Sequence, residues 1–214
     1  MDKLLTFLKN IPEYQLLLKS IDRREAAAVT GLGQINRSHL IAGLRRELER
    51  PIVVICQDDM TAKRLQQELA AFLGETAPVL PSRELTLYDT AVVSRAWEQK
   101  RLKQLYDLAS GRTGLQIMTW ESLSQRTIPP AVLSKAAFTL EVGQEYPLEE
   151  LTEKLIHAGY TRCGMVEGPG QFALRGGIVD IYSPAEERPF RAEFFGDELD
   201  TMGYFDPDTQ RRTD

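Results

Sequence analysis

Residues 168–211 constrain the fold most, because their apolar side chains recur at every second position between residues that form turns. A period of two places such side chains on one face of an extended strand. Gly176 and Gly177 interrupt the pattern once, and Gly196 and Asp197 interrupt it again, as expected of tight turns between antiparallel strands. The sequence therefore predicts an antiparallel sheet with these inward positions: Phe172, Leu174, Val179, Ile181, Phe190, Ala192 and Phe194.

The opposite face of the run at 190–195 carries Arg191, Glu193 and Phe195. Arg191 and Phe195 are four residues apart, which is roughly 13 Å on an extended strand. Arginine and aromatic side chains dominate protein-binding hot spots, because they offer a planar set of donors and a large contact area. One interpretation is therefore a protein-binding surface. The other is structural: Phe195 packs beneath a neighbouring loop and Arg191 pairs with Glu193.

The preceding part of the chain alternates between short apolar runs and amphipathic segments. Two short helices are expected on either side of Pro12. Alternation of strands and helices predicts a parallel sheet with helices on both faces. The uninterrupted apolar run at 52–56 is typical of a strand that is buried on both sides. The predicted strands are 26–29, 52–56, 79–80 and 115–120, and the predicted helices are 34–49, 60–73, 94–108 and 121–125.

A pair of prolines at 129–130 precedes a change of pattern and predicts a domain boundary. We expect an α/β domain at 1–135 and a small α+β domain at 136–214. In the second domain, a strand at 137–142 and an amphipathic helix at 147–158 are expected before the antiparallel sheet.

The two parts of the chain differ in charge. Residues 1–136 hold 19 Lys and Arg against 15 Asp and Glu, whereas residues 137–214 hold 7 against 16. A negative field repels phosphate groups, so the second part favours a protein partner over nucleic acid; an acidic, solvated surface is the alternative. No apolar run reaches the roughly 20 residues of a membrane span, and the N-terminus lacks a signal-peptide pattern. We therefore expect a cytoplasmic protein.

Nucleotide, metal and catalytic sites are not expected. A phosphate-binding loop needs GxxxxGK[ST], in which glycine amides and a lysine hold phosphates and a hydroxyl group binds Mg²⁺. Residues 29–44 keep Gly31 and Gly33 but lack the Lys-Ser/Thr pair, so we predict no nucleotide cofactor. The cysteines and histidines lack the spacing of a metal site; they are Cys56, Cys163, His39 and His157.

An ordered set of residues between 168 and 211 resembles the second domain of the nucleotide-excision-repair protein UvrB and of the N-terminal region of transcription-repair coupling factors (the Mfd family). The matching residues are Gly170, Phe172, Arg175, Gly176, Asp180, Pro184, Arg191, Phe194, Phe195, Asp197, Glu198, Phe205, Asp206, Pro207 and Arg211. In both families this domain binds UvrA, so the resemblance implies a binding surface rather than a catalytic centre. By motif match, the resemblance implies UvrA contacts by Arg175, Arg191 and Phe195. It implies that Gly176 and Gly177 hold the local backbone.

A second pattern resembles the coupling factors more than UvrB. Residues 80–108 follow LPxxExxxYDxxxxSxxxxxxRLxxLYxL, as in the degenerate UvrB-like module of that family. UvrB itself has an intact phosphate loop and a β-hairpin insertion, for which this chain leaves no room. The resemblance therefore implies a degenerate P-loop or helicase-like parallel sheet without a working nucleotide site.

The resemblance also implies a function: a fragment of a coupling factor that recruits UvrA to stalled RNA polymerase in transcription-coupled nucleotide-excision repair. The fragment is then no enzyme. The parent protein is expected to be an ATP-dependent DNA translocase, which binds ATP and Mg²⁺ in its motor domains and contacts RNA polymerase and DNA through other domains. Two alternatives stay open: an ATP-dependent UvrB-like DNA helicase, and direct DNA binding by the mildly basic residues 1–136.

Overall fold

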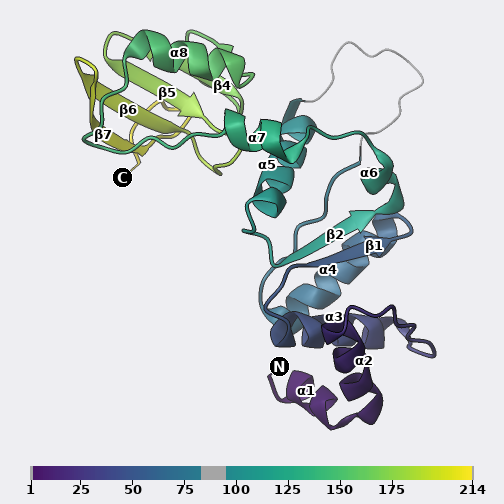
Figure 1. Ribbon diagram of the computed structural model, residues 1–214. Helices are drawn as coiled ribbons and strands as arrows, with labels where there is room; N and C mark the ends of the chain where they lie inside the picture. Colours follow the sequence, from purple (N-terminus) through teal and green to yellow (C-terminus); the bar gives the residue numbers. More distant parts are fainter. Residues whose placement is uncertain (1, 83–94, 214) are drawn as a thin grey trace. The chain divides into compact units, whose positions relative to one another are not determined.

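The computed structural model describes residues 2–82 and 95–213, which form two compact units (Figure 1). Unit 1 combines residues 1–85 with residues 111–126, and unit 2 contains the rest of the chain. The chain therefore contributes two separate stretches to each unit. The domain boundary predicted near residue 136 stays a prediction.

Some sequence expectations fall outside the described residues. Four members of the pattern at 80–108 are among them: Glu84, Tyr88, Asp89 and Ser94. Among the helices that the structure does describe, none is long and apolar enough to cross a membrane.

The helices of unit 1 start and stop at residues suited to those positions. They are α1 (Asp2–Phe7), the 3₁₀-helix η1 (Leu8–Asn10), α2 (Pro12–Asp22), α3 (Gln34–Glu47), α4 (Asp59–Leu73) and α6 (Trp120–Ser124). Pro12 occupies the first turn of α2, where its missing N–H is tolerated. At the start of α4, the Asp58 carboxylate accepts a hydrogen bond of 2.7 Å from the backbone N–H of Thr61. The helices predicted for this part of the chain are confirmed.

The sheet of unit 1 has two parallel strands in the part of the chain that the structure describes, β1 (Ile52–Cys56) and β2 (Leu115–Thr119). Val79 adds only an isolated bridge to Ile117, where a strand was predicted at 79–80. One face of the sheet packs against α3 and α4, which confirms the α/β class of this region. The buried residues of this core are Leu5, Ala42, Cys56, Ala62, Leu65, Leu69, Ala77, Leu115 and Ile117.

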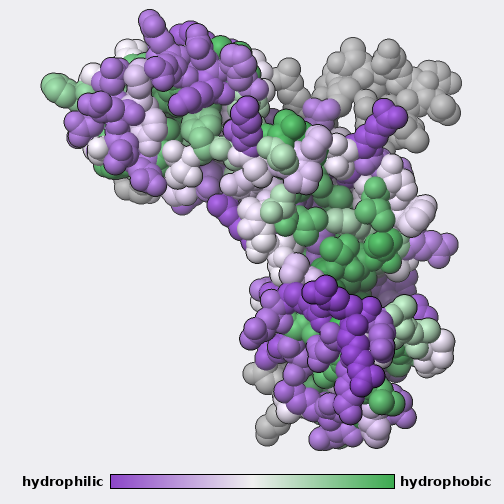
Figure 2. All heavy atoms as spheres, viewed as in Figure 1, coloured by the Kyte–Doolittle hydropathy of each residue, from purple (hydrophilic) through white to green (hydrophobic). Residues whose placement is uncertain are grey.

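The other face of β1 is open, against expectation. Val53 is 46% exposed and Ile55 is 51% exposed. Figure 2 shows apolar side chains gathered over the β1 and α6 part of unit 1. The prediction that this strand is buried on both sides is therefore wrong. Residues 26–29 are exposed and form no strand, because three alanines provide too little apolar area to hold an edge strand in place.

Unit 2 contains a five-stranded sheet and three helices among its described residues. The helices are α5 (Arg95–Ala109), α7 (Pro130–Ala136) and α8 (Leu148–His157), and the strands are β3 (Thr161–Arg162), β4 (Gln171–Arg175), β5 (Ile178–Tyr182), β6 (Phe190–Phe195) and β7 (Glu198–Tyr204). The strand order is β3-β4-β5-β6-β7. Strands β4 to β7 are antiparallel as predicted, but β3 pairs in parallel with β4, so the sheet is mixed.

One further expectation for unit 2 needs correction, and another is confirmed. Residues 137–142 form no strand, whereas residues 130–136, which follow the proline pair, form α7. Pro130 occupies the first turn of that helix, where its missing N–H is tolerated. The helix predicted at 147–158 is confirmed as α8.

The two faces of the five-stranded sheet have different surroundings. Helix α8 covers one face of the sheet (Figure 1). Leu151 and Leu155 of α8 pack on this face, where all seven predicted inward residues lie in or against the core. The opposite face has a smaller cluster of Val166, Ala173 and Phe205. The period-two pattern therefore identified the larger core correctly.

Candidate protein-binding site

Arg175 and Phe195 lie at the same end of the five-stranded sheet. Arg175 is the last residue of β4 and pairs with Ile178 across a two-residue turn. Phe195 is the last residue of β6 and pairs with Glu198 across another such turn. Because β4 and β6 are both antiparallel to β5, they run in the same direction and both turns occur at one end.

The glycines between Arg175 and Ile178 allow this turn to form. Gly176 has a φ of +60°, in the left-handed region that favours glycine. A Cβ atom on Gly177 would lie 2.7 Å from the carbonyl oxygen of Phe194. The Gly177 carbonyl in turn accepts a hydrogen bond of 2.7 Å from the backbone N–H of Phe194. Gly176 is therefore required for its backbone conformation, and Gly177 is required because a side chain would collide with Phe194.

Phe194 and Phe195 are neighbours with opposite environments. Phe194 packs against the core below α8, together with Phe190. Phe195 points to the other face and is 86% exposed. An aromatic side chain this exposed at the end of a strand adds nothing to its own core, so it is available to a partner.

Arg191 and Arg175 converge on one buried carboxylate. Asp180 of β5 pairs with Arg191 of β6 in the sheet and is fully buried. The Arg191 Nε donates to Asp180 Oδ1 at 2.6 Å, and its Nη2 donates to Oδ2 at 3.0 Å. The Arg175 Nη2 donates to the same Oδ2 atom. The structure thus brings together two arginines that are 16 positions apart in the sequence.

The two arginines differ in how much of each is open to solvent. The side chain of Arg191 is 17% exposed, whereas that of Arg175 is 47% exposed. The Arg191 guanidinium lies over the ring of Phe205, with Cζ 5.0 Å from the ring centroid. Its hydrogen bonds to Asp180 raise the pKa of Arg191, although burial acts in the opposite direction.

Phe205 reaches the arginine face because of a β-bulge. Glu193 pairs with Thr201 and Phe194 pairs with Leu199, which leaves Asp200 as an extra residue in β7. Leu199 points into the core below α8, whereas Phe205 belongs to the cluster on the opposite face. Without the bulge, these two residues would share a face, because they are an even number of positions apart.

The structural interpretation of the outward face does not hold. Phe195 is not covered by a loop, and Arg191 pairs with Asp180, while Glu193 lies 3.7 Å from Arg212.

Sequence reasoning did not single out Asp180 as a site residue. The available signal was its position, since an acidic residue between the core residues Val179 and Ile181 must find a partner on the other face. The roles of Arg175, Arg191 and Phe195 in binding stay predictions.

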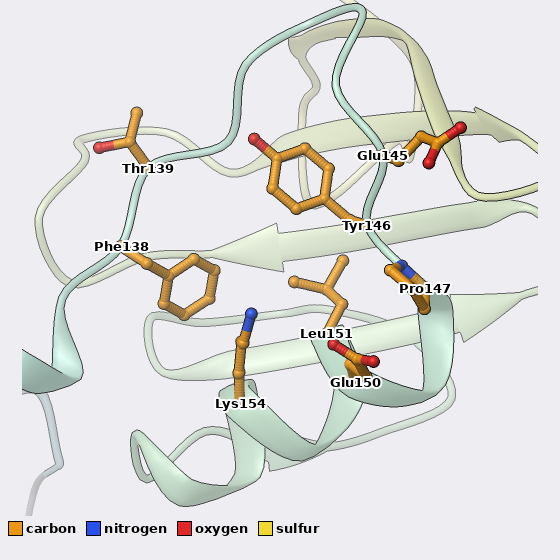
Figure 3. A pocket seen from close by; sticks show the side chains of 8 residues that line it. All are labelled: Phe138, Thr139, Glu145, Tyr146, Pro147, Glu150, Leu151 and Lys154. Carbon is orange, nitrogen blue, oxygen red and sulfur yellow. The ribbon is translucent and has the colours of Figure 1, made fainter.

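A cleft of about 270 Å³ lies on the other side of this domain, between α8 and the segment before it (Figure 3). Phe138, Tyr146 and Leu151 give it an apolar lining. Figure 3 shows Lys154 of α8 extending toward Phe138, with Glu150 on the same helix. Leu151 belongs to the core below α8, so the cleft lies on the face opposite to the arginines. Its charged groups have both signs, so it favours no particular ligand.

In unit 1, the expected remnant of a phosphate loop holds a carboxylate. Ser38 Oγ donates to Glu68 Oε2, and Gln34 Nε2 donates to Glu68 Oε1 at 2.8 Å. Arg64 Nη1 donates to the Gln34 side chain at 2.6 Å. Gln34 and Ser38 of α3 are thus bonded to an acidic group, whose charge disfavours phosphate nearby.

Comparison with known proteins agrees with the features of the second domain. Residues 138–214 match the family model described as the UvrB interaction domain. The chain is 33% identical to the transcription-repair-coupling factor of Myxococcus xanthus over 86% of its own length and 16% of the relative. It is 30% identical to that of Escherichia coli (92% and 17%) and 28% identical to that of Bacillus subtilis (99% and 18%).

Residues 138–214 therefore match the UvrB interaction domain, and in this chain that stretch forms the mixed sheet and its covering helix α8. The chain as a whole is similar to transcription-repair-coupling factors, and it spans less than a fifth of the length of those relatives. The resemblance expected from the sequence motifs is confirmed.

Proposed function

We propose that this chain recruits UvrA, as the UvrA-binding part of a coupling factor that acts on stalled RNA polymerase in transcription-coupled nucleotide-excision repair. The observation that carries the proposal is the exposed Phe195 at the same end of the sheet as Arg175 in a UvrB interaction domain. Exposed aromatic and arginine side chains are the residue types most often found at binding hot spots. The site holds no arrangement that suggests chemistry on a substrate.

The complete protein would carry further activities outside this chain. We propose that it is an ATP-dependent DNA translocase of the cytoplasm, which contacts RNA polymerase and DNA through other domains. Unit 1 would then be the degenerate helicase-like part of the UvrB-like module. Its parallel strands β1 and β2 and their helices support this proposal.

Titration of the chain against purified UvrA tests the proposed function. Phe195→Ala should weaken binding by about 30-fold, equivalent to about 2 kcal/mol, because it removes a central apolar anchor. Phe7→Ala is a matched control, since Phe7 is also exposed but lies in α1 of unit 1. Circular dichroism should show that both variants keep the fold. Full affinity of Phe195→Ala for UvrA would refute this assignment of the surface.

The nucleotide-dependent alternative predicts a different result. A UvrB-like helicase would bind Mg²⁺-ATP through the loop that precedes α3. We propose that this chain does not, because Ser38 and Gln34 are bonded to the Glu68 carboxylate. Calorimetric titration with Mg²⁺-ATP should show no binding in the micromolar range, and saturable binding there would favour the helicase.

A further inference from the structure

We propose that Asp180 is a positioning residue for the partner surface, which it serves by fixing the directions of Arg175 and Arg191. The proposal rests on the proposed UvrA-binding function. Asp180 itself is fully buried, so it cannot touch a partner. It would act only through the two guanidinium groups that it binds.

The position of Asp180 follows from the register of three strands. Ala173 of β4, Asp180 of β5 and Arg191 of β6 are directly paired neighbours, so their side chains share one face. Arg175 lies two positions beyond Ala173 on that face and reaches back to the carboxylate. A single residue in the central strand is therefore able to hold arginines from both adjacent strands.

Hydrogen bonding fixes the two guanidinium groups to different degrees. Arg191 uses Nε and Nη2 on Asp180, which sets the plane of its guanidinium against the Phe205 ring. Arg175 uses only Nη2, and almost half of its side chain is exposed. A guanidinium group has five N–H donors, so Arg175 keeps donors for a second carboxylate while Asp180 holds one corner in place.

The charge balance of this cluster suits an acidic group on the partner. Two arginines and one aspartate carry a net charge of +1, within a segment that is strongly acidic overall. A fixed positive group in such surroundings selects a carboxylate with defined geometry rather than any polyanion. Fixing long side chains before the encounter also removes part of the entropy cost of binding.

A substitution that keeps the shape of the side chain separates positioning from simple attraction. Asp180→Asn removes the negative charge while leaving one oxygen that accepts a hydrogen bond. If Asp180 only reduces the local positive charge, the variant should bind UvrA more tightly. If Asp180 positions the arginines, the variant should bind at least about tenfold more weakly. Tighter or unchanged binding overturns the proposal.

Two further variants show whether the effect passes through the arginines. Asp180→Asn added to Arg175→Ala should cost less than Asp180→Asn alone, because residues that act together give non-additive losses. Fully additive losses would contradict this coupling. Asp208→Asn is the matched control, since Asp208 is an exposed aspartate in the C-terminal turn, and it should change affinity by less than about twofold.

Nuclear magnetic resonance of the unaltered chain keeps the proposal testable if Asp180→Asn fails to fold. The Nε–H of Arg191 donates to Asp180, so its proton should give a resolved signal and exchange slowly with water. Exchange as fast as in free arginine would overturn the proposal. This measurement needs no partner.

If Phe195→Ala weakens UvrA binding and Asp180→Asn does not, the proposed function stands and only the positioning role fails.

Discussion

One strand in each of the two sheets buries or exposes side chains against their polarity, and the two strands do so in opposite ways. In unit 1, β1 exposes the apolar side chains of Val53 and Ile55. In unit 2, β5 buries the carboxylate of Asp180 completely. The difference teaches that polarity alone does not decide burial. A charged side chain is buried where arginines from neighbouring strands compensate it, and an apolar one is exposed where no element of the described structure covers it.

The largest effect should come from removing the buried charge. Asp180→Ala should lower the free energy of unfolding by about 4 kcal/mol, because it leaves Arg191 largely buried without its partner. Urea denaturation measures this value. Asp208→Ala is the control, with an expected change within about 0.5 kcal/mol. Equal effects of the two substitutions would show that the burial of Asp180 has no energetic consequence.

A smaller effect should distinguish the two faces of the sheet in unit 1. Ile117 of β2 is fully buried, whereas Ile55 of β1 is about half exposed. Ile117→Ala should lower the free energy of unfolding by about 3 kcal/mol, and Ile55→Ala should lower it by less than about 1 kcal/mol. Thermal and urea unfolding of both variants provide the comparison. Similar losses would mean that the outer face of β1 is packed as well.

The smallest effect should come from a charge placed on the exposed face. Val53→Lys should change the free energy of unfolding by no more than about 0.5 kcal/mol, because the lysine ammonium stays in water. Val54→Lys is the matched control. This substitution should destabilise the fold strongly, because Val54 packs against the core. A large loss from Val53→Lys, measured by the same unfolding assay, would reveal a buried environment on that face.

Local signals in the sequence predicted much of the fold. Asp58 before α4 and Pro12 at the start of α2 are helix-initiating residues whose effect depends only on neighbours. Gly176 marks the turn between β4 and β5, because its backbone conformation is unfavourable for other residues. The period-two pattern then placed Phe172 and its neighbours in the correct core.

Features that depend on distant residues were harder to predict. Residues 26–29 resemble a strand locally, but no strand among the described residues pairs with them. The two-residue strand β3 exists only because β4 offers it an edge. Asp180 is part of the family motif, yet its role needs the register that places it beside Arg191. Alternation placed Phe195 on the outward face, because alternation along one strand is a local property, whereas its exposure depends on what the rest of the fold leaves uncovered.

The extra residue in β7 gives this strand a change of phase. Before Asp200, odd-numbered positions such as Leu199 face α8; after it, odd-numbered positions such as Phe205 face the arginines. Deleting one residue here would exchange the two faces for the rest of the strand, and would take the aromatic ring away from Arg191. Deleting two would preserve the phase but shorten the strand. The position of the Phe205 ring beside Arg191 thus depends on whether the number of residues in β7 is odd or even, as well as on which side chains the strand carries.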